Sequence, residues 1–192
     1  VNACFMGGGK SILVPQFTPE TVAQIISSKK PSFVIGVPTL FDALSRHPKM
    51  HKTNLSCLQA TFSGADSLPR TVKDRFEEMV KKQGGNVQLM EGYGLTEAVT
   101  AIMAMPIGHY REGSIGIPFP DMLAKIVRLD TTNEVPCGEE GEICISGPAV
   151  MLGYLDQPEE TANTLRQHPD GKLWLHTGDI GTMDEDGFFY FK

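Results

Sequence analysis

Residues 57–90, CLQATFSGADSLPRTVKDRFEEMVKKQGGNVQLM, contain the pattern that decides the fold of the first half of the chain. Residues 57–62 are apolar enough for a buried strand, and residues 86–90 form a second such run. Between them a helix begins at Pro69, and its apolar side chains recur with the helical period. These side chains are Val72, Phe76, Met79 and Val80. A strand, a helix and a second strand in this order predict two parallel strands joined by a crossover helix.

The same alternation continues toward the N-terminus. Residues 12–14 are strand-like, and Thr18 can cap a helix that has Pro19 in its first turn. Residues 32–37 are a second candidate for a buried strand, and a short helix begins at Pro38. The fold class is therefore α/β, with part of a doubly wound, mostly parallel sheet. Ligands bind at the carboxyl ends of the strands in such sheets, which directs attention to the loops after residues 62 and 90.

The pattern changes at about Pro106. Residues 122–129 and 142–146 alternate apolar and polar side chains, residues 158–165 favour one short helix, and residues 188–191 are again strand-like. Asp186-Gly187 predicts a hairpin turn before the last strand. We expect two subdomains, an α/β subdomain at residues 1–105 and a small antiparallel β-barrel-like subdomain at residues 106–192.

Composition excludes several classes of protein. Hydrophobic residues make up 41% of the 192 residues and charged residues 21%, which excludes intrinsic disorder. No apolar run approaches the roughly 18 residues of a membrane span. The formal net charge of −6 argues against a general nucleic-acid binder. The four cysteines form no CxxC pair, which favours a reducing, intracellular setting.

Two short patterns imitate known sites without meeting their requirements. Gly9-Lys10-Ser11 has the end of a phosphate-binding P-loop, but the first glycine of that motif is replaced by Cys4. His47 and His51 have the spacing of two metal ligands on a helix, but Pro48 between them disrupts a helix.

The segment Glu91-Gly92-Tyr93-Gly94-Leu95-Thr96-Glu97 carries groups suited to a nucleotide. Gly92 and Gly94 let the backbone approach a flat ligand, and Tyr93 offers a ring on which a base can stack, an interaction worth roughly 1–3 kcal/mol. The Thr96 hydroxyl can donate to a phosphate oxygen. The Glu97 carboxylate is a hard oxygen ligand suited to Mg²⁺. A tight turn with a capping threonine explains the same residues without any ligand.

Two further segments complete the candidate site. Asp179, in Thr177-Gly178-Asp179, can accept hydrogen bonds from both ribose hydroxyls, each worth about 1.5–3 kcal/mol. Ser63-Gly64-Ala65 consists of small residues at a strand end, where an adenine ring could lie against the backbone. A turn aspartate and close helix–strand packing are the alternatives.

Together these segments resemble the adenylate-forming superfamily, and within it the AMP-forming acyl-CoA synthetases. Gly92 to Glu97 is similar to the Tyr-Gly-x-Thr-Glu motif, and Thr177-Gly178-Asp179 is similar to the ribose motif. Ser63-Gly64-Ala65 resembles the adenine-side motif, although Asp66 and Ser67 stand where alanine and proline are common. Further matches are Ser114 to Pro118, Gly141 to Gly147, Gly153-Tyr154 and Pro158 to Thr161.

The resemblance implies an enzyme that activates a carboxylic acid, a fatty acid by preference, with ATP and Mg²⁺. The product, an acyl-adenylate, would pass its acyl group to coenzyme A. Thr96 and Glu97 would be catalytic, with Glu97 on Mg²⁺. The ATP or AMP contacts would come from Ser63, Gly64, Ala65, Gly92, Tyr93, Gly94, Thr96 and Asp179.

The acyl group is expected to lie near a second set of small and apolar residues. This set comprises Val37, Pro38, Gly92, Val99 and Thr100, with Ala101 beside them. Ordinary sheet core is an equally good explanation of the apolar members.

The resemblance also implies parts that these residues do not include. The phosphate loop of the family would precede Val1, and its hinge and C-terminal domain with a catalytic lysine would follow Lys192. We therefore expect a piece that is inactive alone, from a cytoplasmic protein that can also associate peripherally with a membrane. A non-catalytic nucleotide-binding or interaction module, and an enzyme that transfers the acyl group to a carrier-protein thiol, remain alternatives. The sequence leaves the oligomeric state open.

Overall fold

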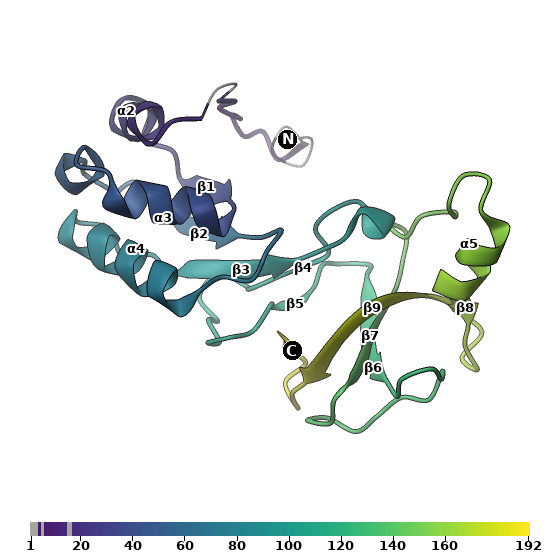
Figure 1. Cartoon of the computed structure of the whole chain (residues 1–192). Coiled ribbons are helices and arrows are strands. Elements are labelled where there is room, and N and C mark those ends of the chain that lie inside the picture. The colour runs from purple at the N-terminus through teal and green to yellow at the C-terminus, as the bar shows by residue number, and fades with distance from the viewer. Residues whose placement is uncertain (1–3, 5, 15–16) are drawn as a thin grey trace.

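The computed structural model describes residues 4, 6–14 and 17–192. Two five-stranded sheets organise this part of the chain, and Figure 1 shows them side by side. Three helices accompany the first sheet, and a fourth, α5, accompanies the second. This architecture confirms the α/β class and the mostly parallel sheet followed by an antiparallel lobe.

The first sheet has the strand order β1-β2-β3-β4-β5. Strands β1 (Phe33–Gly36), β2 (Ala60–Ser63) and β3 (Leu89–Tyr93) are parallel. Strands β4 (Met103–Ala104) and β5 (Ile117–Pro118) extend the sheet in antiparallel pairing. Since β5 comes from the second half of the sequence and pairs with the first, the two halves share this sheet. The division at residues 105 and 106 stays a prediction.

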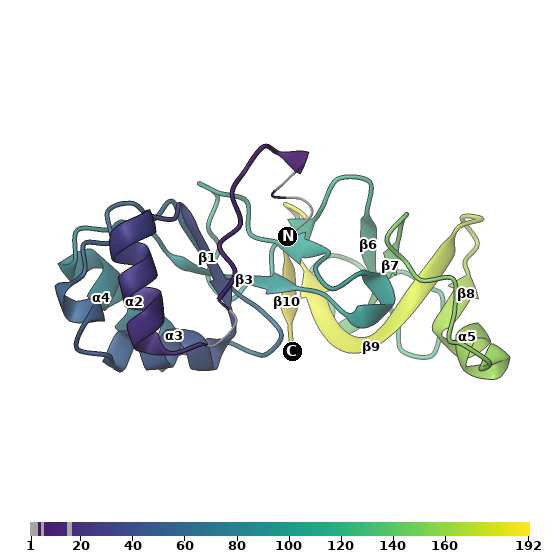
Figure 2. The ribbon, with the colours of Figure 1, turned by 90° about the horizontal axis from the view of Figure 1, so that it is seen from above.

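Helices α2 (Pro19–Lys29), α3 (Pro38–Arg46) and α4 (Arg70–Lys82) pack together on one side of this sheet (Figures 1 and 2). Their shared core centres on Phe41 and Phe76, whose rings meet edge to face at 4.9 Å between centroids. Leu89 of β3 joins this core, whereas the next residue, Met90, packs with Phe188 on the opposite face. Alternate side chains of a strand point to opposite faces, so both faces of β3 are covered.

The helix starts follow the predicted signals. Thr18 caps α2, and its side-chain oxygen accepts a hydrogen bond from the Thr21 backbone N–H at 3.1 Å. Proline stands in the first turn of α2 and of α3, where its missing N–H costs nothing. Pro69 is the N-cap of α4 rather than its first residue.

Several strand predictions need correction. Residues 12–14 form no strand, and the predicted strand at 57–62 begins only at Ala60. The predicted strand at 86–90 lies instead at Leu89–Tyr93, so the first residues of the expected glycine-rich loop belong to β3. Apolar content alone does not fix a strand boundary, because backbone pairing with β2 decides where the ladder starts.

The expected buried strand at residues 32–37 is an edge strand. Phe33 is 49% exposed and Ile35 is 75% exposed, whereas Val34 packs against the helices. Among the described residues β1 pairs only with β2, and the helices cover only the face to which Val34 points.

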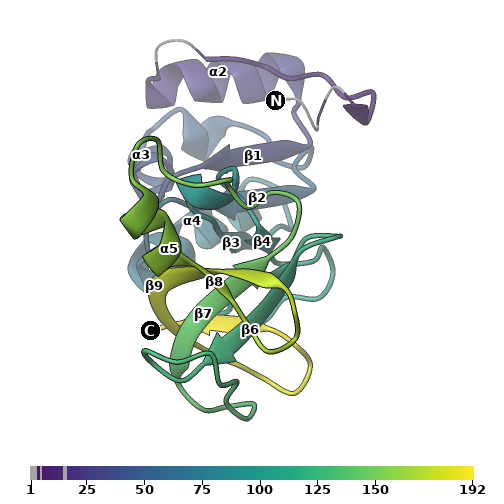
Figure 3. The same ribbon diagram turned by 90° about the vertical axis from the view of Figure 1, so that its right-hand side faces the viewer.

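The second sheet is antiparallel, with the order β10-β9-β7-β6 and β8 paired to β9. Its strands are β6 (Leu123–Val127), β7 (Gly141–Ser146), β8 (Leu165–Gln167), β9 (Leu173–Met183) and β10 (Phe189–Phe191). β9 was not predicted, and it is the long curved strand that dominates Figures 2 and 3. The predicted hairpin turn is present between β9 and β10, with Gly187 in the left-handed region at φ 81°.

Helix α5 (Pro158–Thr164) lies beside β8 and β9 at the outer end of the lobe (Figure 1). Two short 3₁₀ helices lie in the connections, η1 (Met50–Lys52) and η2 (Thr96–Ala98). A single β-bridge between Gly116 and Phe189 connects the two sheets. The described residues contain no helix that is both long and apolar enough to cross a membrane.

Candidate functional site: a cavity between the sheets

The candidate site lies where the end of β3 approaches β9. Tyr93 is the last residue of β3, and Asp179 lies in β9 of the other sheet. The Tyr93 hydroxyl donates a hydrogen bond to Asp179 Oδ2 at 2.5 Å, although 86 residues separate the two. Burial, together with this carboxylate, raises the pKa of Tyr93 above its ordinary range, so the phenol stays protonated as the donor. The stacking residue and the ribose residue expected from the sequence are therefore neighbours.

A cavity of about 460 Å³ opens beside this contact. Glu97 from η2 and Asp179 from β9 both line it. The remaining lining comes from Leu95 just before η2, from the loop before α5, from α5 itself and from β7, β8 and β9. Those residues include Tyr154, Glu160, Arg166, His176 and Thr177. The cavity is thus built by segments that lie far apart in the sequence.

Acidic side chains outnumber basic ones in the lining of the cavity. The acidic residues are Glu97, Glu142, Glu160 and Asp179, and the lining contains one arginine, Arg166. A polyphosphate would be repelled by this set unless a divalent cation accompanied it.

A family model described as AMP-binding enzyme matches residues 1–155. The chain belongs to the AMP-binding enzyme family. The long-chain-fatty-acid–CoA ligase of Bacillus subtilis (strain 168) is 44% identical over 184 residues, which cover 95% of this chain and 31% of that protein. This member of the family therefore spans about a third of the length of the curated relatives that it matches.

Two solved structures of CoA ligases show the same fold. The long-chain-fatty-acid-CoA ligase of Archaeoglobus fulgidus superposes with a TM-score of 0.88 at 24% identity, covering 100% of this chain and 40% of that chain. The anthranilate CoA ligase solved in complex with anthranoyl-AMP gives a TM-score of 0.80 at 26% identity. That match covers 96% of this chain and 34% of the ligase.

In this member of the AMP-binding enzyme family, Thr96 and Glu97 lie in η2, three and four residues after the glycine-flanked Tyr93. Gly94 is required there, since a Cβ at this position would lie 1.5 Å from the Thr100 carbonyl oxygen. Thr96 is exposed. Glu97 is fixed at its carboxylate, where Oε1 accepts a hydrogen bond from the Tyr154 hydroxyl at 2.8 Å. That hydrogen bond is the main reason that the pKa of Tyr154 is raised.

Glu97 fits the cation that the family resemblance implies. Mg²⁺ prefers carboxylate oxygens and usually keeps several waters, so one or two protein carboxylates suffice. Glu97 Oε2 has no hydrogen-bond partner among the described residues and belongs to a side chain that lines the cavity.

The expected adenine-side segment lies one strand away. Ser63 ends β2 and pairs with Glu91 of β3, and a Cβ at Gly64 would make an ordinary van der Waals contact of 3.6 Å with the Gly92 carbonyl oxygen. The Ser63 hydroxyl is buried and has no hydrogen-bond partner within the described ranges. Ala65 follows with φ 64°. These residues lie at the carboxyl ends of the parallel strands, as the α/β fold predicts.

The residues expected around an acyl group are not part of the cavity. Val37 and Val99 are 41% and 72% exposed, Thr100 is exposed, and Pro38 is buried at the start of α3. Gly92 lies within β3 and pairs with Ala104. Their role in acyl binding stays a prediction.

Sequence reasoning assigned no role to Tyr154, Glu142, His176 or Arg166, all of which line the cavity. Signals for two of them were present, because Gly153-Tyr154 and Gly141-Glu142 belong to the stretches that resemble family motifs. His176 directly precedes the ribose motif. Nothing in the local sequence marks Arg166.

Proposed function

We propose that this chain is the nucleotide-binding centre of a longer AMP-forming acyl-CoA synthetase. The complete enzyme would join a carboxylic acid to ATP, release pyrophosphate, and then transfer the acyl group to the thiol of coenzyme A. The hydrogen bond between Tyr93 and Asp179 is the observation that carries this proposal. It brings the aromatic ring of one sheet and the carboxylate of the other to one place, beside a cavity of nucleotide size.

The roles of the residues follow from their chemistry. The Tyr93 ring would stack on adenine, and the Asp179 carboxylate would accept hydrogen bonds from ribose hydroxyls while its Oδ2 also holds Tyr93. Thr96, exposed at the start of η2, would donate its hydroxyl to the α-phosphate. The exposed position leaves this hydroxyl free to reach a ligand.

Two bond exchanges make up the reaction. In the first, a carboxylate oxygen of the acid bonds to the α-phosphorus while the bond from that phosphorus to pyrophosphate breaks. In the second, the thiolate sulfur bonds to the acyl carbon, and the bond from this carbon to AMP breaks. Mg²⁺ on Glu97 would neutralise charge on the phosphates during the first exchange. Thr96 would support the same charge by a fixed hydrogen bond.

We propose a fatty acid as the substrate and an aryl acid as its competitor. A relative with 44% identity is a long-chain-fatty-acid–CoA ligase, which favours a fatty acid for this chain as well. An aryl acid is the competing substrate, since a solved structure with the same fold binds anthranoyl-AMP. We place the complete protein in the cytoplasm, in keeping with the four cysteines, which are free.

Exchange of labelled pyrophosphate into ATP tests the proposal on the complete protein. We expect exchange that depends on a fatty acid, together with formation of an acyl thioester when coenzyme A is added. Exchange that depends on benzoate-type acids instead would reassign the substrate. Thioester formation only with a phosphopantetheine carrier protein would reassign the acceptor. Nucleotide binding without any acid-dependent exchange would favour the non-catalytic module and contradict the proposal.

A further inference from the structure

The Asp179 carboxylate is held in a bulge of β9. The pairing of β7 with β9 changes register between Glu142 and Cys144, so that Ile143 faces three residues, 177–179, instead of one. Gly178 adopts φ 76°, a left-handed conformation that glycine adopts without strain. The backbone N–H groups of a bulge have lost their ladder partners and need others. The Asp179 N–H donates to Thr177 Oγ1 at 3.1 Å, so the partner of the Gly178 N–H is a further contact that fixes the backbone at Asp179.

Glu142 supplies one of these partners from the neighbouring strand. Its Oε1 accepts a hydrogen bond from the Gly178 backbone N–H at 2.9 Å, directly beside Asp179. Its Oε2 accepts a second hydrogen bond from His176 Nδ1 at 2.7 Å. Because the Glu142 side chain is only 11% exposed, the burial of its charge needs both of these donors.

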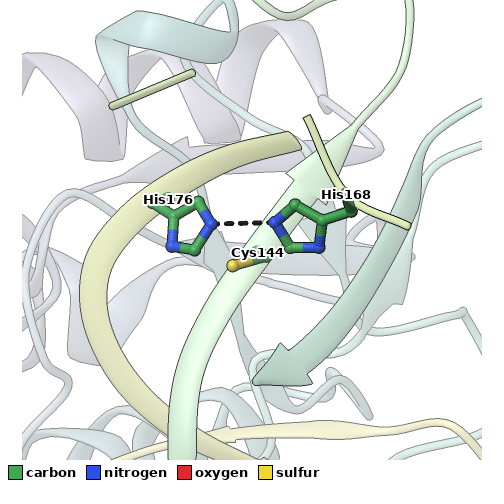
Figure 4. A group of neighbouring side chains, drawn as sticks. All are labelled: Cys144, His168 and His176. Atoms are coloured by element: carbon green, nitrogen blue, oxygen red, sulfur yellow. Dashed lines mark hydrogen bonds between the residues drawn. The ribbon is translucent and has the colours of Figure 1, made fainter. Parts of the chain in front are cut away.

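A second histidine completes the chain of hydrogen bonds. A carboxylate only accepts hydrogen bonds, so His176 Nδ1 carries the hydrogen that it donates to Glu142, and in this tautomer His176 Nε2 is an acceptor. His168 Nε2 lies 2.9 Å from His176 Nε2 and can donate a hydrogen bond to it (Figure 4). Burial and nearby Lys125 lower the pKa of His168, which keeps that ring neutral. The network therefore runs from His168 through His176 and Glu142 to the backbone beside Asp179.

Cys144 lies next to the two histidines, and the three possible ligand atoms are within 4.8 Å of one another (Figure 4). The hydrogen bond between the rings already uses both Nε2 atoms. Burial raises the pKa of the Cys144 thiol to about 12, so the sulfur stays protonated and is a poor metal ligand. The hydrogen-bond network explains this group better than a metal site.

We propose that Glu142 is a positioning residue for the nucleotide ribose. Glu142 lines the cavity, but both of its carboxylate oxygens are engaged by Gly178 and His176. Its role is therefore to fix the bulge that carries Asp179, with His176 and His168 orienting its carboxylate. This inference rests on the proposed function, because it assumes that Asp179 binds the ribose hydroxyls.

The substitution Glu142→Gln isolates this role with little change of volume. Glutamine has one amide oxygen to accept and one amide nitrogen that only donates. It cannot accept from both Gly178 and His176, so one buried N–H is left without its partner. The exposed neighbour Glu140, which pairs with Lys192 at 3.3 Å, gives the matched control Glu140→Gln.

The experiment measures KM and kcat of the complete enzyme for ATP, 2′-deoxy-ATP, the acid and coenzyme A. We expect Glu142→Gln to raise the KM for ATP about tenfold, the size of one weakened hydrogen bond to a charged group. The KM for the acid and for coenzyme A should not change. The preference for ATP over 2′-deoxy-ATP should fall by a similar factor, whereas Glu140→Gln should leave every value unchanged.

A double variant distinguishes the ribose-binding role of Asp179 from the positioning role of Glu142. In an Asp179→Ala background, Glu142→Gln should have no further effect on the KM for ATP, because the residue that it positions is gone. If Asp179→Ala alone leaves this KM unchanged, the assigned ribose role fails. If Asp179→Ala raises it but Glu142→Gln does not, only the positioning role is overturned.

An equal increase of KM for both nucleotides would mark a general structural defect and would also overturn the inference. Should Glu142→Gln not yield folded protein, Glu142→Asp provides the same comparison. Its carboxylate keeps both acceptor atoms but is one methylene shorter, so it too should lose part of the preference for ATP. Full retention of that preference would contradict the proposal.

Discussion

Asp179 is the residue on which the nucleotide assignment depends most directly. Its carboxylate already accepts one hydrogen bond, from Tyr93, and lines the cavity with its remaining acceptor positions. A carboxylate that holds two hydroxyls of one sugar distinguishes a nucleotide from inorganic phosphate. Tyr93 is half-buried against the core and contacts Asp179 through its hydroxyl, and stacking of its ring on a base stays a prediction.

We predict that Asp179→Ala in the complete enzyme weakens ATP binding by roughly 1.5–3 kcal/mol, or about 10- to 150-fold, because charged hydrogen bonds to the ribose are lost. Equilibrium binding of ATP measured by calorimetry checks this value. Asp121→Ala is a suitable control, because Asp121 is an exposed aspartate outside the cavity. An unchanged ATP affinity in Asp179→Ala would remove this residue from the site.

At the scale of elements, the turn from β3 into η2 sets the position of Thr96 and Glu97. The turn folds back tightly enough that the Thr100 N–H donates to the Leu95 carbonyl oxygen at 3.0 Å. Glycine at position 94 makes this turn possible, because a Cβ there would collide with the backbone of residues 100–101.

We predict that Gly94→Ala lowers the rate of adenylation by more than about tenfold while the enzyme remains folded, since the turn must shift and carry Glu97 with it. Pyrophosphate release and a thermal melt measure the two properties. Gly108→Ala is the control, because Gly108 has φ 86°, where alanine is strained, but open space around it, so this variant strains the backbone away from the site without the collision expected at Gly94. Full activity of Gly94→Ala would show that the turn adapts without cost to the site.

The hairpin of β8 and β9 contains a titratable group that affects stability. His168 is 3% exposed, and burial is the main reason that its pKa is lower than the usual value of about 6.5. The unfolded chain therefore binds a proton at a higher pH than the folded chain does. Stability due to neutral His168 is complete above the ordinary pKa and is lost as the pH falls toward the folded value.

We predict that the melting temperature of the complete enzyme falls between about pH 7.5 and about pH 5, and that His168→Gln makes this fall smaller because the titrating ring is gone. Thermal melts at a series of pH values provide the measurement. His109→Gln, at an exposed histidine, should retain the full pH dependence. The same dependence in all three proteins would assign it to other groups.

For the whole molecule, the cavity is lined by the segment after β3, by α5 and by strands of the second sheet, and under the proposed function it would offer more contacts to a nucleoside than to a triphosphate. Its lining has four acidic side chains and one arginine, and the chain spans about a third of the length of the curated relatives that it matches. In a complete enzyme of the length of these relatives, the other two thirds would have to supply the contacts to the β- and γ-phosphates.

We predict that the 192-residue chain, expressed alone, releases no pyrophosphate from ATP and a fatty acid, because charge on the phosphates is left without sufficient compensation. A coupled pyrophosphate assay with the complete enzyme as positive control tests this. Turnover above the background of a protein-free reaction would refute it.

Much of the fold could be predicted from the sequence, because the information is local. The helical period of Val72, Phe76 and Val80 and the cap at Thr18 depend on residues a few positions apart. The hairpin turn at Gly187 follows from glycine in the left-handed region, which is again a local property. The long strand β9 was not predicted, since its curvature and bulge depend on pairing with β7, more than thirty residues away.

Short motifs predicted three of the chemical groups at the candidate site, since the residue types of Tyr93, Glu97 and Asp179 suit a base, a cation and a ribose. Only the tertiary structure decided that these groups meet, because the approach of β3 to β9 arises from packing between two sheets and not from local conformation. The tertiary structure also decided how Asp179 is held. The hydrogen bonds from Gly178 and His176 to Glu142 join positions that are 36 and 34 residues apart, respectively, and no local pattern encodes such a distance.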